Sequence, residues 1–517
     1  MFGIVVSEAD HASTHIREHL LDLADWQAVE DTETPADEGG GTVYRLPADA
    51  PETAGDTPVE LRSFAELHID IDDPTPAFGG SPTDPVAVGE SSTDDEPTDD
   101  LDLLVFASRH SGDTGALLTA HFTGNFGPAT YGGQPGSFAR ACPNAQKRIV
   151  SAFDEYAPDD YEVGIECTHH GPTAVAVPTM FAELGSGDEQ WRDPAGARAV
   201  AQAILAVVGV AADRDKQVVG FGGGHYAPRF ERVIRETDWA VGHIGADWPL
   251  DEMGAPDANR ETLRRAFEAS AADYALLEAE YPDLEAVLDD LGYRVVSETF
   301  VRETDRVPLA LVEQLESRLC RVDDGLRFGT PARVDGDVSG DADGDGVAGD
   351  PSVDAADGAS ETATPAVVVR DLPADLLAEA QGVDGEAVWD RVRGNCLAVE
   401  TTEHGSTVAG RAAFREGSVT ADTDRLLAGL VEVLREKYDE VSRVAADGDE
   451  AAEVVARRST FDPEKAKTLG ISEGPAFGKL ASGQAVEVGG RTIQPETVTS
   501  EETRRFSVDS LVGSSAE

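Results

Sequence analysis

Short apolar runs alternate with helix-length amphipathic segments over residues 1–250, and this alternation limits the possible folds more than any other feature of the sequence. The runs have the length of buried strands, and the segments between them carry their apolar residues at helical spacing. This order is typical of an α/β fold, a mostly parallel or mixed sheet flanked by helices. The expected strands are residues 2–6, 61–70, 101–107, 116–121, 162–167, 217–221 and 239–244, and the expected helices are residues 13–23, 140–154, 194–211 and 260–291.

The 517 residues exceed what one ordinary core accommodates, so we expect more than one domain. Residues 1–300 carry the α/β pattern and are expected to form the first domain. Two segments within it, about 31–60 and 78–100, are rich in Asp, Glu, Gly, Pro and Thr, which predicts acidic surface insertions outside the sheet. We expect a mixed connecting segment (301–334), an acidic disordered linker (335–365) and a smaller C-terminal α+β region (366–517) to follow.

The net charge is −58, from 41 basic and 99 acidic residues, and the acidic residues are spread along the whole chain. This charge excludes a protein that binds duplex nucleic acid through a broad basic face. Spread acidity with scarce lysine favours adaptation to a salt-rich cytoplasm, where ions screen the repulsion, over an acidic partner-binding tail. No apolar segment reaches the roughly 20 residues that span a membrane. The start of the chain lacks the basic region of a secretory signal, and the four cysteines are widely spaced, so we expect a cytoplasmic protein without a disulfide framework.

Five histidines stand at or directly after the ends of expected strands. Ligands of open α/β sheets bind beyond the carboxyl ends of the strands, so we expect these imidazoles to meet at one such edge. There they could ligate a metal or transfer protons near neutral pH. The alternative, five histidines scattered over a polar surface, does not account for their common position. They are His110, His121, His169, His170 and His225.

The segment ECTHHGPT, residues 166–173, is the strongest candidate for a site. His169 and His170 lie in a turn shaped by a glycine and a proline, so they can face one cavity as metal ligands or as general acid and base. Glu166 can orient an imidazole. A polar surface loop is the alternative, and it is disfavoured because the segment follows an apolar strand.

The segment GGGHYAPR, residues 222–229, is the second candidate. After a strand, the amides of three glycines can approach a phosphate or an oxyanion, and His225 and Tyr226 would then face the same place. The segment is neither a GxGxxG fingerprint nor a Walker A loop, and a tight structural turn is the alternative. In the SRHS segment, residues 108–111, Arg109 could bind a phosphate or a carboxylate.

ECTHHGPT and GGGHYAPR, in this order and together with the earlier SRHS and YGGQP segments, resemble the archaeal type of D-aminoacyl-tRNA deacylase over about residues 1–300. The resemblance implies hydrolysis of the ester between a D-amino acid and the 3′ end of tRNA, which releases both. It also implies a core similar to peptidyl-tRNA hydrolases and nucleoside phosphorylases, and one or two zinc ions per subunit. Together with the composition it implies a halophilic archaeal source, and we expect a monomer. Residues 469–489 are similar to a C-terminal segment of tRNA 3′-processing endonucleases, but without an HxHxDH motif they imply no nuclease activity.

For this reaction we assign three sets of residues. The expected catalytic residues are Glu166, Thr168, His169, His170, His225 and Tyr226. The expected substrate-binding residues are Ser108, Arg109, His110, Gly222, Gly223, Gly224 and Arg229, with the glycine amides holding the oxyanion. The expected zinc ligands are His169, His170, His225 and His121.

Contact with the tRNA is expected through local basic patches, for example Arg140, Lys147, Arg148 and Arg229, because the chain as a whole repels a polyanion. Two other functions remain open at this point. One is a metal-dependent hydrolase or phosphorylase that acts on a nucleoside or an amide. The other is a module that binds tRNA ends without turnover.

Overall fold

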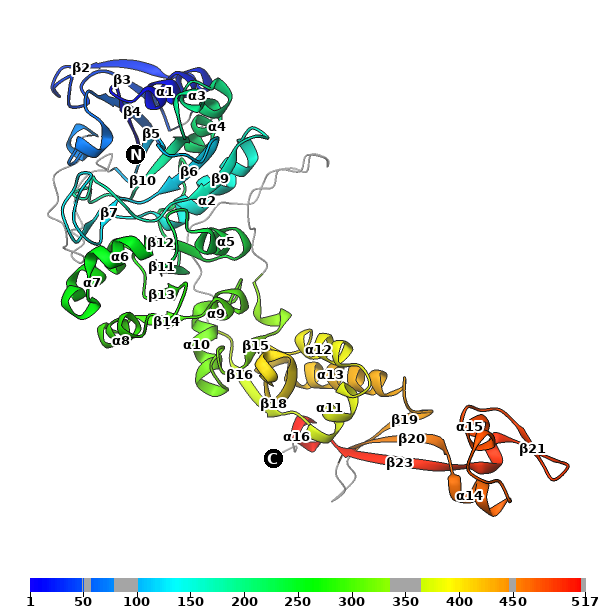
Figure 1. The fold of residues 1–517 in the computed structure, drawn as a ribbon. Coiled ribbons are helices and arrows are strands. Elements are labelled where there is room, and N and C mark those ends of the chain that lie inside the picture. The colour runs from blue at the N-terminus through cyan, green and yellow to red at the C-terminus, as the bar shows by residue number, and fades with distance from the viewer. Residues whose placement is uncertain (49, 51–56, 79–100, 335–363, 446–451, 513–517) are drawn as a thin grey trace, which may run out of the picture. The chain divides into compact units, whose positions relative to one another are not determined.

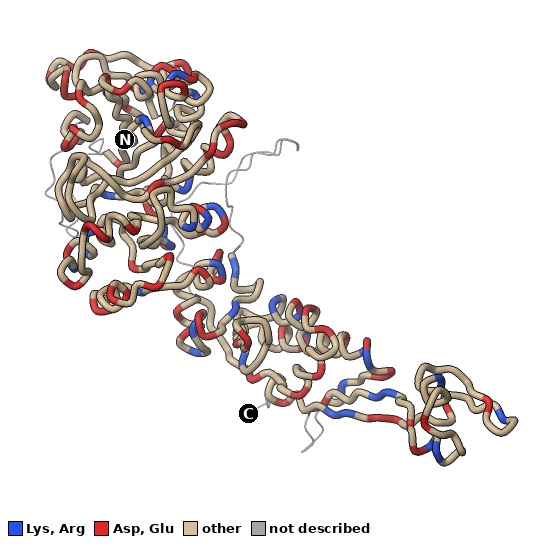
Figure 2. The backbone as a smooth tube through the Cα atoms, viewed as in Figure 1, with Lys and Arg blue, Asp and Glu red and all other residues tan. Residues whose placement is uncertain are grey.

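The computed structural model describes the chain except for residues 49, 51–56, 79–100, 335–363, 446–451 and 513–517 (Figure 1). It divides into two compact units, Met1–Arg302 and Glu303–Glu517. Asp and Glu residues recur along both units (Figure 2). In the described part, no helix is both long and apolar enough to cross a membrane.

The first unit is built on a mixed sheet of eight strands in the order β2-β3-β4-β1-β5-β10-β6-β9. Strands β4, β1, β5 and β10 run parallel, whereas β6 runs antiparallel to β10 and parallel to β9. The hairpin β2–β3 extends one edge. The strands are β1 (Phe2–Ser7), β2 (Gln27–Asp31), β3 (Gly41–Leu46), β4 (Val59–Phe64), β5 (Leu103–Arg109), β6 (Leu117–His121), β9 (Glu162–Ile165) and β10 (Thr179–Gly185).

Helices α1 (His11–Leu23), α2 (Pro143–Tyr156) and α4 (Pro194–Leu205) cover one face of this sheet. Asp10 and Asp193 cap α1 and α4 by accepting hydrogen bonds from the first free backbone amides of each helix. The small and β-branched residues of α4 pack closely on the central strands, and the opposite face of the sheet carries larger aromatic side chains. We call this opposite face the aromatic face, and polar side chains can lie on it beside the aromatic rings.

The first unit also contains a second, parallel sheet of four strands in the order β12-β11-β13-β14 and a short antiparallel pair, β7 (Gly124–Asn125) and β8 (Ser137–Phe138). The strands of the second sheet are β11 (Gln217–Phe221), β12 (Ala240–Gly245), β13 (Tyr274–Leu277) and β14 (Arg294–Val296). The helices that follow them are α5 (Pro228–Glu236), α6 (Asp247–Met253), α7 (Arg260–Ser270), α8 (Pro282–Leu291) and α9 (Glu298–Glu303), and the short α3 (Asp188–Trp191) precedes α4.

The α/β class predicted from the sequence is confirmed, but three local expectations differ from the structure. Residues 41–46 form β3 of the sheet, so they do not stand outside it. Residues 260–291 contain β13 between two helices, and β10 was not predicted at all. The expected insertion at 78–100 and the expected linker at 335–365 lie almost wholly outside the described residues.

The second unit has an antiparallel sheet in the order β15-β17-β18-β16, packed against three helices. The sheet strands are β15 (Leu326–Phe328), β16 (Val367–Asp371), β17 (Ala398–Thr402) and β18 (Thr407–Arg415). The helices are α11 (Ala374–Gln381), α12 (Gly385–Arg393) and α13 (Val419–Leu434), preceded by α10 (Leu309–Arg318). A further sheet, β19-β20-β23, is formed by β19 (Glu440–Val444), β20 (Glu453–Phe461) and β23 (Thr499–Ser507), and α16 (Asp509–Val512) follows it.

Candidate active site

The candidate site lies on the aromatic face of the large sheet. Because β6 runs antiparallel to β10, the carboxyl ends of β5 and β6 point in opposite directions. His110 and His121 therefore do not share one carboxyl edge, and that part of the sequence expectation is wrong. Strand β10 instead brings the two ends together, since Phe181 pairs with His121 and, two residues on, Glu183 pairs with Ser108.

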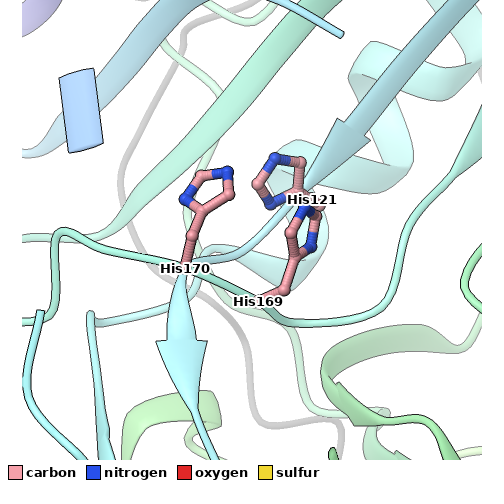
Figure 3. Close-up of side chains that lie close together, drawn as sticks. All are labelled: His121, His169 and His170. Carbon is pink, nitrogen blue, oxygen red and sulfur yellow. The ribbon is translucent and has the colours of Figure 1, made fainter. Parts of the chain in front are cut away.

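The loop after β9 carries its histidines onto this face. The amide of Cys167 donates to the carbonyl of His225 at 2.7 Å, which ties the loop to the second sheet. His170 has a φ of 46°, a left-handed conformation that turns the chain sharply between the two imidazoles. The rings of His169 and His170 then lie 4.4 Å and 4.9 Å from the ring of His121, measured between centroids (Figure 3).

In each of these three imidazoles, Nδ1 is hydrogen-bonded to a backbone carbonyl. The Nδ1 atoms of His121, His169 and His170 lie 3.1, 2.8 and 2.6 Å from the carbonyl oxygens of Phe122, Cys167 and Gly171, respectively. A carbonyl can only accept, so the proton sits on Nδ1 and Nε2 is the nitrogen that faces the cluster. Burial lowers the pKa of His170 to about 3 and also holds that of His169 below its usual value, so both rings are neutral.

Glu166 is the centre of a second group. Its buried carboxylate accepts a hydrogen bond from Nε2 of His225 at 2.7 Å, and Nε2 of both His110 and His169 lies 3.7 Å away. Burial raises the pKa of Glu166, but the surrounding imidazoles outweigh burial and leave the pKa below its usual value. For His225 the directions are reversed: burial lowers its pKa, but the side chains of Cys167 and Glu166 outweigh burial and raise the pKa to about 10.

Glu183 is a carboxyl group that the sequence reasoning missed. Its Oε1 lies 3.5 Å from Nε2 of His121, and burial raises the pKa of Glu183 to about 7. Glu166 and Glu183 therefore titrate far apart, which is the arrangement that acid–base sites use. A single glutamate in the apolar run TMFAELG was the available signal for it.

The donor atoms fit a metal ion. The described part of the chain has four groups of three residues in which the donor atoms lie within 4.8 Å of one another, and two pairs of these groups share no residue. Among the described residues, Oε1 of Glu166 is buried without a hydrogen-bond partner, and Nε2 of His121 has the long 3.5 Å contact with Oε1 of Glu183; a bound metal ion would satisfy both atoms. Imidazole, thiolate and carboxylate donors are those that zinc takes. One such pair is His121, His169 and His170 with His110, Glu166 and His225, and the other is Cys167, His169 and His225 with His121, Glu166 and Glu183.

The hydroxyl of Thr168 is hydrogen-bonded to residues of the second sheet. Its Oγ1 accepts from the amide of Ile244 and contacts Nδ1 of His243, both at 3.0 Å, and Nε2 of His243 lies 2.9 Å from the carbonyl of Ala139. The hydroxyl is thus occupied by the second sheet. This arrangement favours a positioning role for Thr168 over the catalytic role that we expected from the sequence.

The remaining predicted residues divide between the site and its surroundings. The hydroxyl of Tyr226 lies 3.4 Å from Nε2 of His110, whose Nδ1 lies 2.9 Å from the hydroxyl of Ser186. The guanidinium of Arg109, however, lies over the ring of Trp191 at 5.2 Å. Ser108 is buried beside Glu183 on the sheet face.

The glycine loop differs from the expectation. The amide of Gly222 donates to the carbonyl of Gly245 at 2.8 Å, and the amide of Gly223 donates to Oδ1 of Asp247 at 3.2 Å. Two of the three amides are therefore already occupied, and the expectation that they hold an oxyanion is wrong for both. Gly224 is exposed.

The expected basic patch is also largely occupied. Arg140 donates to the carbonyls of Ala141 and Ala269 and pairs with Asp213. Lys147 donates to two carbonyls, that of Thr237 at 2.6 Å and that of Ile234. Arg229 pairs with Glu298 at 3.1 Å and, with Arg232, lines a cavity of about 460 Å³. These side chains hold the fold together.

Fold and site together define an α/β protein with a buried histidine–glutamate centre suited to acid–base or metal-assisted hydrolysis. A sequence model described as D-aminoacyl-tRNA deacylase matches residues 97–296. The D-aminoacyl-tRNA deacylases of Halorubrum lacusprofundi and Haloarcula marismortui are 49% and 47% identical to this chain, over 100% and 98% of its length and 99% and 100% of theirs. The chain belongs to the D-aminoacyl-tRNA deacylase family and is a hydrolase.

This result confirms the resemblance found in the sequence, including the halophilic archaeal source of the relatives. The chain is also similar to a solved structure titled as a conserved protein of unknown function. The two share 27% identity with a TM-score of 0.48, over 60% of this chain and 99% of the other.

Proposed function

We propose that this chain hydrolyses the ester of D-aminoacyl-tRNA and releases the D-amino acid and the tRNA. The observation that supports this most is the pair of carboxyl groups, Glu166 and Glu183, set among imidazoles on one sheet face. An aminoacyl ester is already reactive, so its hydrolysis needs an oriented water and groups that move protons. Family membership points to the same reaction.

His225 is the imidazole best placed to meet the substrate. Its side chain is 34% exposed, compared with 18% for His169, and Glu166 holds its Nε2 in place. Beside it, the exposed hydroxyl of Tyr226 reaches His110. We assign proton transfer to His225, its orientation to Glu166, and positioning of the ester to Tyr226 and His110.

We further propose that the site binds zinc. His121, His169 and His170 would hold the ion through their Nε2 atoms. A zinc ion bound there would supply Lewis-acid chemistry to the ester hydrolysis. The carbonyls that fix each Nδ1 would orient the three rings before metal binds.

The experiment compares zinc content and turnover in variants. His169→Ala and His170→Ala are expected to lower both the bound zinc, measured by elemental analysis, and the hydrolysis of D-tyrosyl-tRNA. His11→Ala, which removes an exposed histidine of α1, is the matched control and is expected to change neither. Full zinc content in both site variants would refute the zinc proposal. Turnover of nucleosides or amides in place of the D-aminoacyl ester would refute the deacylase proposal.

A further inference from the structure

The charge of the chain is unevenly distributed. The whole chain carries −58, whereas residues 453–507 contain eight acidic and eight basic residues. This stretch comprises β20, β23 and the residues between them, where Lys and Arg recur along the trace (Figure 2). In a chain with six lysines, three lie between residues 465 and 479. This region therefore has no net charge and holds half of the lysines, in a chain that is strongly acidic as a whole.

This region contains a small lobe with a core of its own. The lobe consists of α14 (Pro463–Thr468), α15 (Pro475–Ala481), β21 (Val486–Val488) and β22 (Arg491–Ile493), and we call it the lysine lobe. At its base the amide of Asp462 donates to the carbonyl of Val498 at 2.7 Å. Its core residues are Ala466, Ile471, Leu480, Val486 and Val498, none of which belongs to the main core of the second unit.

The lysines outside the lobe serve the fold. Lys216 pairs with Asp238 at 2.7 Å and Lys437 pairs with Glu379 at 2.6 Å, whereas Lys147 is partly buried and its Nζ donates to two backbone carbonyls. Such contacts leave little positive charge for an external partner.

The cations of the lobe are more available. Lys479 and Arg491 are exposed, and neither side chain has a hydrogen bond or ion pair to any described residue. Lys465 donates to the carbonyl of Thr499, which does not neutralise its charge. Only Lys467 of these four is paired with carboxylates, those of Glu464 and Glu473.

We propose that the lysine lobe binds the phosphate backbone of the tRNA. This inference rests on the proposed function, which makes a polyanion the substrate. The acidic surface repels phosphate, so a region that lacks net negative charge and has unpaired cations is favoured for binding. Ammonium and guanidinium groups without internal partners are the groups that contact phosphate oxygens. A contact that ignores base identity also suits an enzyme that must accept many tRNAs.

The test measures binding of uncharged tRNA to the full chain at several molar KCl concentrations. The double variant Lys479→Glu/Arg491→Glu is expected to raise the dissociation constant about tenfold and to make its salt dependence shallower by about two phosphate contacts. The matched control is Arg321→Glu/Arg391→Glu, which reverses two exposed arginines of the same unit and changes the net charge equally. It is expected to change the dissociation constant less than about twofold.

Circular dichroism checks that the variants fold, and Lys479→Arg/Arg491→Lys is expected to retain binding. Unchanged binding by the lobe variant, or equal weakening by the control pair, would overturn the proposal.

Turnover separates this proposal from the proposed function. The lobe variant is expected to raise KM for D-tyrosyl-tRNA and to leave hydrolysis of 3′-D-tyrosyl-adenosine, which lacks the tRNA body, unchanged. Normal turnover of D-tyrosyl-tRNA by the lobe variant, with an unchanged KM, would refute the proposal that the lysine lobe binds tRNA and leave the proposed function intact. Lobe-dependent tRNA binding by a parent chain that hydrolyses neither ester would refute the proposed function alone.

Discussion

Replacing Thr168 by valine removes one buried hydroxyl that ties the histidine loop to the second sheet. That hydroxyl accepts a hydrogen bond from the amide of Ile244 and donates one to Nδ1 of His243, both at 3.0 Å. Burial lowers the pKa of His243 to about 3, so its ring is neutral, and the proton it carries is on Nε2, toward the carbonyl of Ala139. Every donor and acceptor in this chain of hydrogen bonds is used.

Valine has nearly the shape of threonine, so the substitution leaves no cavity and isolates the hydrogen bonds. It leaves two buried groups without their hydrogen-bond partner, the amide of Ile244 and Nδ1 of His243. A buried group that loses its partner costs about 1–3 kcal/mol, so the free energy of unfolding is expected to fall by about 2–6 kcal/mol. Thr168 lies between Cys167 and His169, and a shift of about 1 Å in the imidazoles would lower kcat about 100-fold.

The assay is urea unfolding in molar KCl, with kcat for D-tyrosyl-tRNA measured in parallel. Thr179→Val is the matched control, because the Thr179 hydroxyl is buried without a hydrogen-bond partner in the described part of the chain. It is expected to change the unfolding free energy by less than about 0.5 kcal/mol. If Thr168→Val matched this control in stability and kept full turnover, the positioning argument would be refuted.

Three further changes test separate parts of the account. His225→Ala is expected to lower kcat/KM for the D-aminoacyl ester at least about 100-fold, and near-normal turnover would contradict its role. Gly223→Ala places a Cβ 1.9 Å from Oε2 of Glu278 at a φ of +84°, so we expect a fall of about 2–4 kcal/mol in unfolding free energy by urea titration; unchanged stability would count against this packing. Burial lowers the pKa of His68 to about 3, so between pH 6.5 and 3 only the unfolded chain binds a proton at this residue. The free energy of unfolding therefore decreases as the pH is lowered through this range. His68→Leu is expected to remove about 1.4 kcal/mol per pH unit of that slope, and an identical slope would show that His68 is charged when folded.

Local patterns in the sequence were enough to predict the α/β class and the two loops that carry the site. Residues 166–170 and His225 follow apolar runs that form β9 and β11, and such runs signal buried strands without knowledge of their partners. Polar side chains directly after them then point to a site. The neighbouring imidazoles of His169 and His170 did lie together, as adjacency in the sequence requires.

The direction of β6 could not be predicted in the same way. Pairing between β6 and β10 joins residues about 60 positions apart, and nothing in either run specifies an antiparallel neighbour. This pairing moved the site from a strand edge to a sheet face and brought in Glu183. The occupied amides of Gly222 and Gly223 were hidden for the same reason, since their acceptors, Gly245 and Asp247, belong to a distant segment.

Deacylation of matched D- and L-tyrosyl-tRNA in molar KCl, with and without a chelator, tests the central claim most directly. We expect fast loss of the D ester, slow loss of the L ester, arrest by the chelator and recovery on adding zinc. D-selective hydrolysis that ignores the chelator would contradict the metal role and leave the imidazoles and Glu166 with proton transfer alone. Equal stability of both esters in the presence of the full chain and zinc would contradict the deacylase function itself.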